Sequence, residues 1–332
     1  MAEILIDLVM PWVDDKDSAW QDERQRYSEK KEEHSQTLFR DWELLRYWFR
    51  GVERALPWIH RVYFLTWGHL PPWLNTNHSK LRIIRHEDFL PQKYRPTFSS
   101  IPISVNVHRI PELSEQFIYT NDDCYFLAQM KPEDYFRGGL PCDCLYIQPI
   151  TEVDAKGFGH ILWNNIDVLN EHFDLQECIR QYQDKWFSSI YPARVLEENE
   201  WAKKLSRFPG FTNPHLPQPM LRSTFEAVWE KAYASLHHSS MHKFRSPEDC
   251  NEWLMRYWQF ATGRFTPYIR EGGKSMAICA PEEELRDTLL SNRYRVVCLN
   301  EGHQKVNFEA RKAYLKELFE IVFPDRSSYE LF

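Results

Sequence analysis

The stretch Phe117-Ile118-Tyr119-Thr120-Asn121-Asp122-Asp123 decides how this chain is interpreted, because apolar, strand-forming residues end in an amide and two adjacent carboxylates. Two like charges beside a buried strand repel each other and lose hydration unless a cation or strong donors compensate them. Mg²⁺ and Mn²⁺ prefer oxygen ligands, and they also bind the phosphates of nucleotides. Because Asn and Asp are common turn residues, the stretch by itself fits a strand-ending turn equally well.

The composition is that of a globular protein. The chain has 332 residues, of which 43% are hydrophobic and 27% charged, enough for one large domain or two ordinary ones. Its net charge of -7 and the lack of a long basic run argue against nonspecific nucleic-acid binding as its main task. The 13 Trp, 16 Tyr and 21 Phe are compatible with stacking on sugars or bases, and equally with core packing.

The cysteines and the first residues bear on the cellular compartment. The seven cysteines are scattered, and the spacing in Cys142-Asp143-Cys144 is too short for the usual zinc pair. Reduced thiols in a cytoplasmic protein are the simplest account. The segment 1–7 lacks the basic region of a signal peptide, and no stretch approaches the roughly 18 apolar residues of a membrane span. We therefore expect a cytoplasmic protein without a transmembrane segment.

The first 150 residues alternate between strand and helix patterns. The predicted strands are 4–13, 61–66, 81–84 and 116–120, and the predicted helices are 17–33, 44–56 and 99–109. This order is typical of an α/β sheet, in which ligands bind outside the carboxyl ends of the strands. The polar residues expected at such ends, and hence in one crevice, are Asp14, Thr66, His86 and Asp122.

After about Glu152 the pattern becomes mainly helical. The predicted helices are 163–169, 175–186, 222–236 and 248–260, with a Pro-rich stretch, 209–219, separating them. A strand follows at 294–299. We therefore divide the chain into an α/β part, 1–150, a mainly helical part, 151–290, and a part that completes the same domain with a returning strand and a C-terminal helix, 291–332.

An ordered set of motifs resembles the conserved blocks of the Stealth proteins. These motifs include Trp12-Val13-Asp14, Pro72-Trp73-Leu74, Arg85-His86-Glu87-Asp88, Pro96-Thr97-Phe98-Ser99-Ser100, His108-Arg109-Ile110-Pro111, Asn121-Asp122-Asp123, His215-Leu216-Pro217, Phe244-Arg245-Ser246 and Cys298-Leu299-Asn300. The match spans nearly the whole chain in order, which makes it more specific than any single motif. Stealth proteins are bacterial capsule or cell-surface polysaccharide phosphotransferases, similar to the catalytic core of the eukaryotic enzyme that places N-acetylglucosamine-1-phosphate on lysosomal mannose.

The resemblance implies transfer of a sugar-1-phosphate from a nucleotide sugar, commonly UDP-linked, to a hydroxyl of a glycan or lipid-linked glycan. A phosphodiester forms and a nucleoside monophosphate leaves. It also implies a glycosyltransferase-A-like, Rossmann-like nucleotide-binding sheet with a mainly helical insertion, and a divalent metal, Mg²⁺ or Mn²⁺. In this picture the α/β part binds nucleotide sugar and metal, the helical part serves the acceptor and phosphates, and the enzyme works in the cytoplasm, with contact to the inner face of the bacterial membrane left open.

The catalytic and metal residues follow from the same resemblance. Asp122 and Asp123 are expected to hold the metal, with Glu301 as a ligand across the crevice. Arg245 is expected to bind phosphate through its guanidinium fork, and the alternative is an ordinary salt bridge to Glu248 or Asp249. His215 is expected to take the acceptor proton or to stabilise the phosphoryl group, and the alternative is a loop histidine without a role.

The remaining site residues are assigned to the nucleotide pocket. They are Trp12, Val13, Asp14, Arg46, Thr66, Asn121, His108 and Arg109. Core packing is an equal alternative for Trp12, and helix packing is the alternative for His108 and Arg109.

The chain departs from the family pattern at two acids. Ser104 stands where the family carries a Glu, and the last block ends in Asn300-Glu301 where the family has Asn-Asp. The first change removes a candidate general base and leaves Asp123 as the nearby one. Two other functions remain open on the sequence: a metal-dependent glycosyltransferase that releases UDP, and a catalytically inactive glycan-binding protein.

Overall fold

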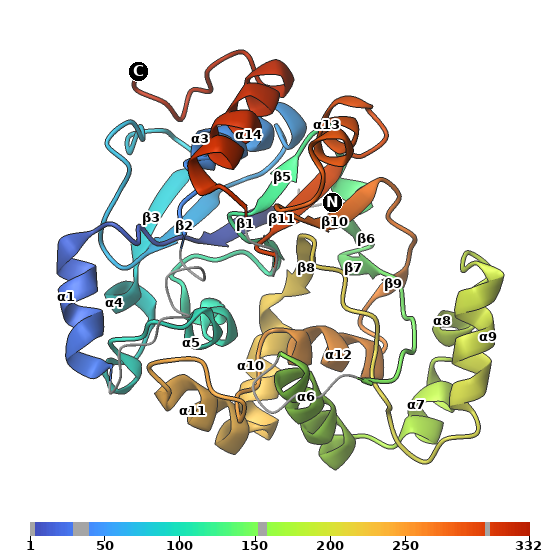
Figure 1. The fold of residues 1–332 in the computed structure, drawn as a ribbon. Coiled ribbons are helices and arrows are strands. Elements are labelled where there is room, and N and C mark those ends of the chain that lie inside the picture. Colours follow the sequence, from blue (N-terminus) through green and yellow to red (C-terminus); the bar gives the residue numbers. More distant parts are fainter. Residues whose placement is uncertain (1–3, 29–39, 152–157, 303–305) are drawn as a thin grey trace.

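The main sheet brings together strands that are far apart in the sequence. The structure, a computed structural model, describes residues 4–28, 40–151, 158–302 and 306–332. The sheet has the order β3-β2-β1-β4-β8 (Figure 1). Its strands are β1 (Ile6–Pro11), β2 (Val62–Thr66), β3 (Leu81–Arg85), β4 (Gln116–Tyr119) and β8 (Gln218–Leu221). The first four are parallel, and β8 runs antiparallel to β4.

The order 3-2-1-4 is that of a Rossmann-like sheet, and it confirms the predicted α/β fold class. The chain builds outward from β1 to β2 and β3, and then continues on the other side of β1 with β4. In such sheets ligands bind at this reversal point, outside the carboxyl ends of the two central strands. The residues that follow β1 and β4 therefore occupy the expected ligand site.

Both faces of the sheet are covered. Successive residues of β1 point to opposite faces, so that Leu8 and Met10 join one hydrophobic core while Val9 joins the other. The first core includes residues of α3 and α14, which lie on one side of the sheet in Figure 1, and the second includes residues of α6, α10 and α12 on the other side. Burial on both faces explains why β1 and β2 are almost continuously apolar.

Two smaller sheets extend the fold. One has the order β10-β11-β5, with β10 (Gly273–Ala277), β11 (Val296–Asn300) and β5 (Cys124–Phe126), and the other consists of β6 (Phe136–Arg137), β7 (Leu140–Asp143) and β9 (Thr266–Pro267). Strand β5 follows β4 after a short link, 120–123. This link contains the two adjacent acids and connects the main sheet to the β10-β11-β5 sheet.

The helices fill the remaining sequence. They are α1 (Ser18–Tyr27), α3 (Leu45–Ala55), α4 (His86–Phe89), α5 (Ser100–Val105), α6 (Gly159–His172), α7 (Leu175–Gln181), α8 (Gln183–Trp186), α9 (Ala193–Ala202), α10 (Arg222–Lys231), α11 (Tyr233–Met241), α12 (Trp253–Ala261), α13 (Glu282–Leu290) and α14 (Phe308–Val322). Single 3-10 turns occur at Gln92–Tyr94, Val107–Arg109 and Pro132–Asp134. No helix within the described ranges is long and apolar enough to cross a membrane.

The predicted strands all appear, with shifted ends, whereas several predicted helices need correction. The predicted helix 99–109 is α5 followed by a 3-10 turn, 175–186 is two helices, and 222–236 breaks at Ala232 between α10 and α11. The helix predicted from 248 begins at Trp253, and α1 ends at Tyr27, with the predicted continuation from 29 to 33 outside the described residues.

The Pro-rich stretch is more than a separator, since its end forms β8. Pro219 pairs with Ile118 of β4. Proline has no N–H for a second neighbour, and it is tolerated here because β8 lies at the edge of the sheet.

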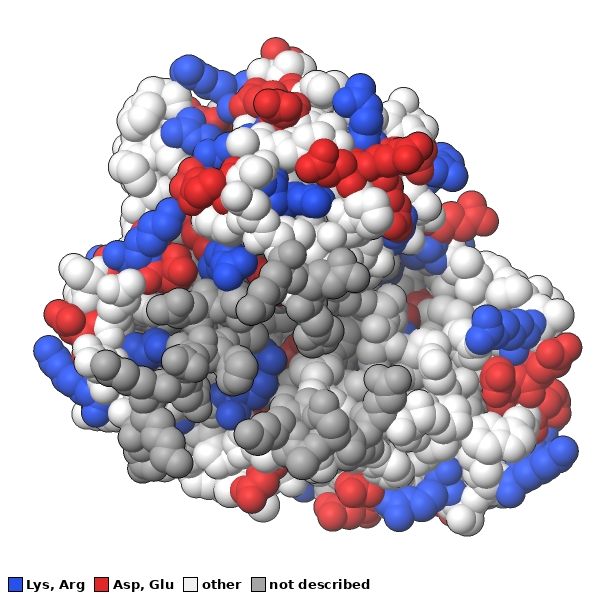
Figure 2. Space-filling view, in the orientation of Figure 1, with Lys and Arg blue, Asp and Glu red and all other residues white. Residues whose placement is uncertain are grey.

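Charges are mixed on the surface that Figure 2 shows. Lys and Arg side chains are scattered among Asp and Glu side chains rather than gathered into one basic patch. The seven cysteines are all free, and all of them are buried except Cys144, which is half-buried.

A buried ion pair fastens the C-terminal segment to α3, and its removal is expected to destabilise the protein. Arg50 Nε lies 2.9 Å from Glu330 Oε1, and Arg50 Nη1 donates to the carbonyl of Phe323 at 2.8 Å. Arg50→Met removes the closer of the two arginines at the buried Glu330 carboxylate and leaves Arg46, at 3.4 Å, and the donors of Ser327. The free energy of unfolding in urea should therefore fall by about 3 kcal/mol, the lower end of the range for breaking a buried ion pair. The matched control is Arg293→Met at the exposed pair with Asp287, which should cost less than about 1 kcal/mol. Equal, small losses in both variants would contradict the assignment.

Candidate active site

The link between β4 and β5 is held by backbone hydrogen bonds to two sheets. Thr120 N donates to the carbonyl of Val9 in β1 at 3.0 Å, and Leu299 N of β11 donates to the carbonyl of Asp123 at 2.9 Å. These bonds fix Asn121-Asp122-Asp123 at the carboxyl ends of the two central strands. The predicted strand-end position of the acids is therefore present in the fold.

The acids at this edge carry more negative charge than the protein neutralises. Asp122 is exposed, yet the surrounding protein removes water from its carboxylate, and this loss of hydration is the main cause that raises its pKa to about 7. Repulsion from Asp123 and Asp41 contributes to the same increase. Burial and the neighbouring Asp41 likewise raise the pKa of Asp15. Buried Oδ1 of Asp15 has no hydrogen-bond partner among the described residues. Crowded carboxylates of this kind fit a divalent cation, which would relieve the repulsion.

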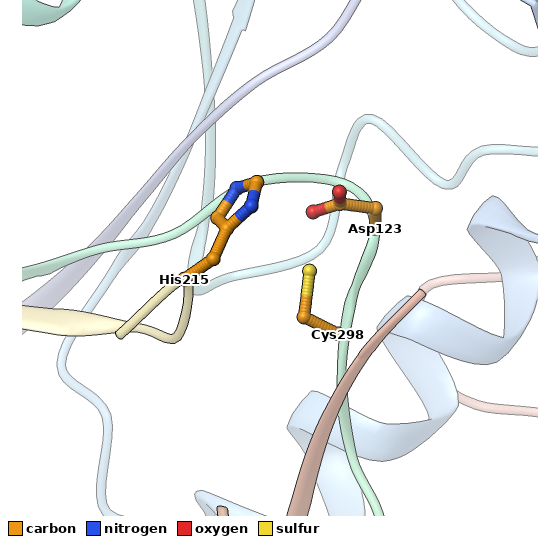
Figure 3. Close-up of side chains that lie close together, drawn as sticks. All are labelled: Asp123, His215 and Cys298. Carbon is orange, nitrogen blue, oxygen red and sulfur yellow. The ribbon is translucent and has the colours of Figure 1, made fainter. Parts of the chain in front are cut away.

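Two further side chains converge with Asp123 of the link (Figure 3). Ligand atoms of Asp123, His215 and Cys298 all lie within 4.8 Å of one another. They come from the link, the loop before β8 and strand β11. Asn121 donates its amide to Nε2 of His215 at 2.8 Å, which orients the imidazole and leaves the ring proton on Nδ1.

Cys298 differs chemically from its two neighbours. The adjacent thiol of Cys124 and burial raise the pKa of Cys298, so its sulfur stays protonated and is a poor ligand. The oxygen donors that suit Mg²⁺ or Mn²⁺ here are the carboxylates of Asp122 and Asp123. The ligand atoms that the structure brings together are those of Asp123, His215 and Cys298, and binding of a divalent metal by Asp122 and Asp123 stays a prediction.

Arg245 has no acidic partner within 4.0 Å among the described residues. Glu248 pairs with His238 at 2.9 Å, and Asp249 pairs with His242 at 2.6 Å. The ordinary salt bridge considered for Arg245 is therefore not formed. Its guanidinium is exposed, and its charge acts on the carboxylate of Glu252. The guanidinium lies 6.0 Å from the centroid of the Phe158 ring, a contact that leaves its N–H donors available to an anion.

Trp12, Asp14 and Thr66 surround His69, a residue that sequence reasoning did not select. The backbone N–H of Asp14 donates to His69 Nε2 at 2.7 Å, and Thr66 Oγ1 donates to the His69 carbonyl at 2.7 Å. Trp12 is buried against the imidazole, with ring centroids 5.3 Å apart. The ends of β1 and β2 thus converge as predicted, with Val13 partly buried in the same loop.

The next strand end also carries a histidine. Burial and the nearby His69 lower the pKa of His86 to about 4, so this imidazole is neutral at physiological pH.

Four predicted site residues are bound elsewhere. Glu301 accepts a hydrogen bond from Trp42 Nε1 at 2.7 Å, and Arg46 donates to the carbonyl of Phe332 at 2.7 Å. His108 and Arg109 pack against Trp229 of α10, with the Arg109 guanidinium 4.7 Å from its ring centroid. Burial, with a smaller effect of Arg109, lowers the pKa of His108 to about 3. The structure does not bring these four side chains to the acidic link, because each finds a closer partner in its own neighbourhood.

Three acids near the site were missed by sequence reasoning. Asp15 carried a signal, since Asp14-Asp15 follows the first strand as Asp122-Asp123 follows the fourth. Asp41 and Glu252 carried none, because they reach the site from distant segments without a motif of their own. Ser104 Oγ donates to Glu252 Oε2 at 2.7 Å across 148 positions of sequence.

A Rossmann-like sheet with clustered acids and an oriented imidazole at its carboxyl edge is an arrangement typical of α/β enzymes. Residues 38–141 match conserved region 2 of the Stealth proteins, and residues 287–332 match conserved region 4. The chain belongs to the Stealth family, and it is a phosphotransferase.

Relatives in this family match the chain from end to end. The capsular polysaccharide phosphotransferase WcwK of Streptococcus pneumoniae is 34% identical over 328 residues, covering 98% of each chain. The receptor polysaccharide phosphotransferase WefC of Streptococcus gordonii is 34% identical over 332 residues, covering 98% of this chain and 99% of the relative. The exopolysaccharide phosphotransferase cps2G of Lactiplantibacillus plantarum is 32% identical over 328 residues, covering 98% and 96%.

Solved structures with some likeness to this fold are glycosyltransferases. The galactosyltransferase LgtC, in complex with donor and acceptor sugar analogues, gives a TM-score of 0.35 at 10% identity and covers 97% of this chain and 98% of its own. Mouse xyloside xylosyltransferase 1 gives 0.33 at 11% identity, covering 90% and 98%. Scores this low carry no argument about chemistry.

Proposed function

We propose that this chain transfers a sugar-1-phosphate from a UDP-linked nucleotide sugar to a hydroxyl of a glycan or lipid-linked glycan in capsule or surface polysaccharide synthesis. The observation that carries the proposal is the crowded acid pair Asp122-Asp123 at the reversal point of the sheet, beside His215. The relatives named above, which act on capsular, receptor and exopolysaccharides by their names, support the acceptor class.

The proposed reaction exchanges one P–O bond for another. The acceptor oxygen attacks the phosphorus nearest the sugar and gives up its proton, while the bond from this phosphorus to the nucleoside monophosphate breaks. Negative charge then spreads over the transferred phosphoryl group and the leaving phosphate. Arg245 is proposed to bind these oxygens through its fork of N–H donors. Nδ1–H of His215, whose other ring nitrogen is held by Asn121, is proposed to donate to a phosphoryl oxygen.

Asp122 and Asp123 are proposed to hold a divalent cation, Mg²⁺ or Mn²⁺. When bound, such a cation neutralises charge on phosphate oxygens of the donor. Glu301 would have to exchange its bond with Trp42 before it could join them. We also propose that the nucleotide contacts lie around Trp12, Asp14 and Thr66, and that the enzyme works in the cytoplasm, where it meets the donor.

The products distinguish this function from its alternatives. The purified chain is incubated with a panel of nucleotide sugars, an acceptor glycan and Mg²⁺ or Mn²⁺, and the released nucleotide is identified by mass. We expect a nucleoside monophosphate, with phosphate retained in the glycan. Release of a nucleoside diphosphate would instead show an ordinary glycosyltransferase, and a chain that binds neither nucleotide sugar nor metal would be a glycan-binding protein.

A further inference from the structure

Glu252 carries a half-buried carboxylate whose contacts do not compensate the hydration that it loses. It directly precedes α12, yet its side chain does not cap that helix. It forms no ion pair within 4.0 Å among the described residues, and its short hydrogen bond comes from the neutral hydroxyl of Ser104, at 2.7 Å. Burying a carboxylate with so little compensation costs stability, so a packing role does not account for it.

The surroundings of Glu252 are the phosphate-binding and acidic parts of the site. Arg245 and the imidazole of His215 both interact electrostatically with its carboxylate. Burial raises the pKa of Tyr119, the last residue of β4, and the negative charges of Glu252 and Asp122 add to the increase. The Tyr119 hydroxyl is hydrogen-bonded with Ser104. Glu252 is therefore near enough to the groups assigned to the donor phosphates to interact with them electrostatically.

We propose that Glu252 is the general base that accepts the proton of the acceptor hydroxyl, with Ser104 positioning its carboxylate; this inference rests on the proposed function. As the acceptor oxygen forms its bond to the phosphorus nearest the sugar, its proton passes to Glu252, and the bond to the nucleoside monophosphate breaks. Glu252, now a carboxylic acid, returns the proton to water after the products leave. Asp122 and Asp123 then remain free to serve as metal ligands.

The environment of Glu252 suits this task. Burial raises the pKa of Glu252 above its ordinary value of 4.5, although hydrogen bonds from Ser104 and from the Glu252 backbone, and the interactions with His215 and Arg245, partly offset the increase. A base is most effective when its pKa is close to the working pH, because it then combines the ionised form with good proton affinity.

The first test compares two acids of the same segment. Glu252→Gln keeps the shape and an acceptor for Ser104 but removes the base, so kcat should fall by about 10²–10⁴-fold while the KM for the donor changes little. The control is Glu248→Gln, which alters an exposed acid bound to His238 and should leave kcat unchanged. A Glu252→Gln variant with the wild-type kcat overturns the proposal.

A second variant covers the case in which Glu252→Gln does not fold, and it separates a base from a structural group. Because Ser104 Oγ and Glu252 Oε2 lie 2.7 Å apart, the exchange Ser104→Glu with Glu252→Ser places a carboxylate at the same point. This double variant should recover at least about tenfold of the activity lost in Glu252→Ser alone. No recovery in a folded double variant argues against the proposal.

The pH dependence of kcat/KM distinguishes a base from a structural residue, because only the loss of a base changes the pH profile. At saturating Mg²⁺, where metal binding keeps the proposed ligand Asp122 ionised, the low-pH limb of kcat/KM should follow Glu252 in the wild type and disappear in Glu252→Gln, since only the ionised carboxylate accepts a proton. The titratable and charged groups facing Glu252 are His215, Arg245, Tyr119 and Tyr257, and they are unchanged in both proteins. An identical limb in the variant overturns the proposal. If the wild type releases a nucleoside diphosphate, the proposed function itself fails, whereas monophosphate release with a fully active Glu252→Gln refutes only this inference.

Discussion

Asp122→Asn is expected to abolish metal-dependent turnover, with a loss in kcat/KM of about a hundredfold to a thousandfold, because several kcal/mol of charge stabilisation depend on a metal carboxylate. Asp123→Asn should behave similarly, since its carboxylate lies within 4.8 Å of the ligand atoms of His215 and Cys298. The fold should persist in both variants, as the link is held by backbone bonds. Activity is measured against metal concentration, with Asp167→Asn, an exposed acid paired with Arg207, as the control. Unchanged activity in both site variants would remove the metal assignment.

The metal titration needs one precaution. His238, His242 and Glu248 also bring ligand atoms within 4.8 Å of one another, on an exposed surface. Calorimetric titrations are therefore made in a His238→Ala background, where loss of binding on adding Asp122→Asn reports on the acidic link alone.

Stability in EDTA provides a pH test of the same acid. The pKa of Asp122 is raised from 3.8 to about 7, so the folded protein holds a proton that the unfolded chain has already released. Wild-type stability should therefore fall as pH rises from about 4 to about 7 and lose nothing further from this group above that range. Asn at position 122 carries no charge, so the variant should gain stability relative to wild type over this interval in urea unfolding. A constant difference between the two proteins would contradict the crowding of these carboxylates.

Arg245→Lys is expected to lower kcat/KM by about tenfold to a hundredfold. A guanidinium offers a planar fork to two phosphate oxygens, whereas an ammonium is a point charge. Losing one charged hydrogen bond costs about 1.5–3 kcal/mol. Stability should not change, because Arg245 has no ion pair among the described residues to lose. The control is Arg207→Lys at the exposed pair with Asp167, and full activity in Arg245→Lys would exclude a phosphate fork.

The sheet could be predicted from the sequence because its central strands are buried on both faces. Residues 61–66 and 116–120 are short apolar runs that end in polar residues, so both the strand and its functional end are visible locally. Strand β8 gave no such signal. Its Pro219 reads as a loop residue, and only the place of β8 at the sheet edge makes the proline acceptable.

The site was less predictable because side-chain direction depends on partners from distant segments. Arg46 and Glu301 match the expected motifs, but Arg46 donates to the carbonyl of Phe332. Glu301 accepts a hydrogen bond from Trp42. Conversely, the resemblance implies an acid at position 104, and the chain has Ser104 there. The carboxylate of Glu252 lies against that serine, although nothing in the local sequence of either residue indicates the contact.

The position of the acid link has a consequence for protein engineering. Its two ends belong to different sheets, since Val9 of β1 bonds one end and Leu299 of β11 the other. Inserting or deleting one residue between 120 and 123 would shift one sheet against the other. The link therefore cannot be grafted alone into another scaffold, and the smallest transferable unit comprises β1, β4, β5 and β11 together.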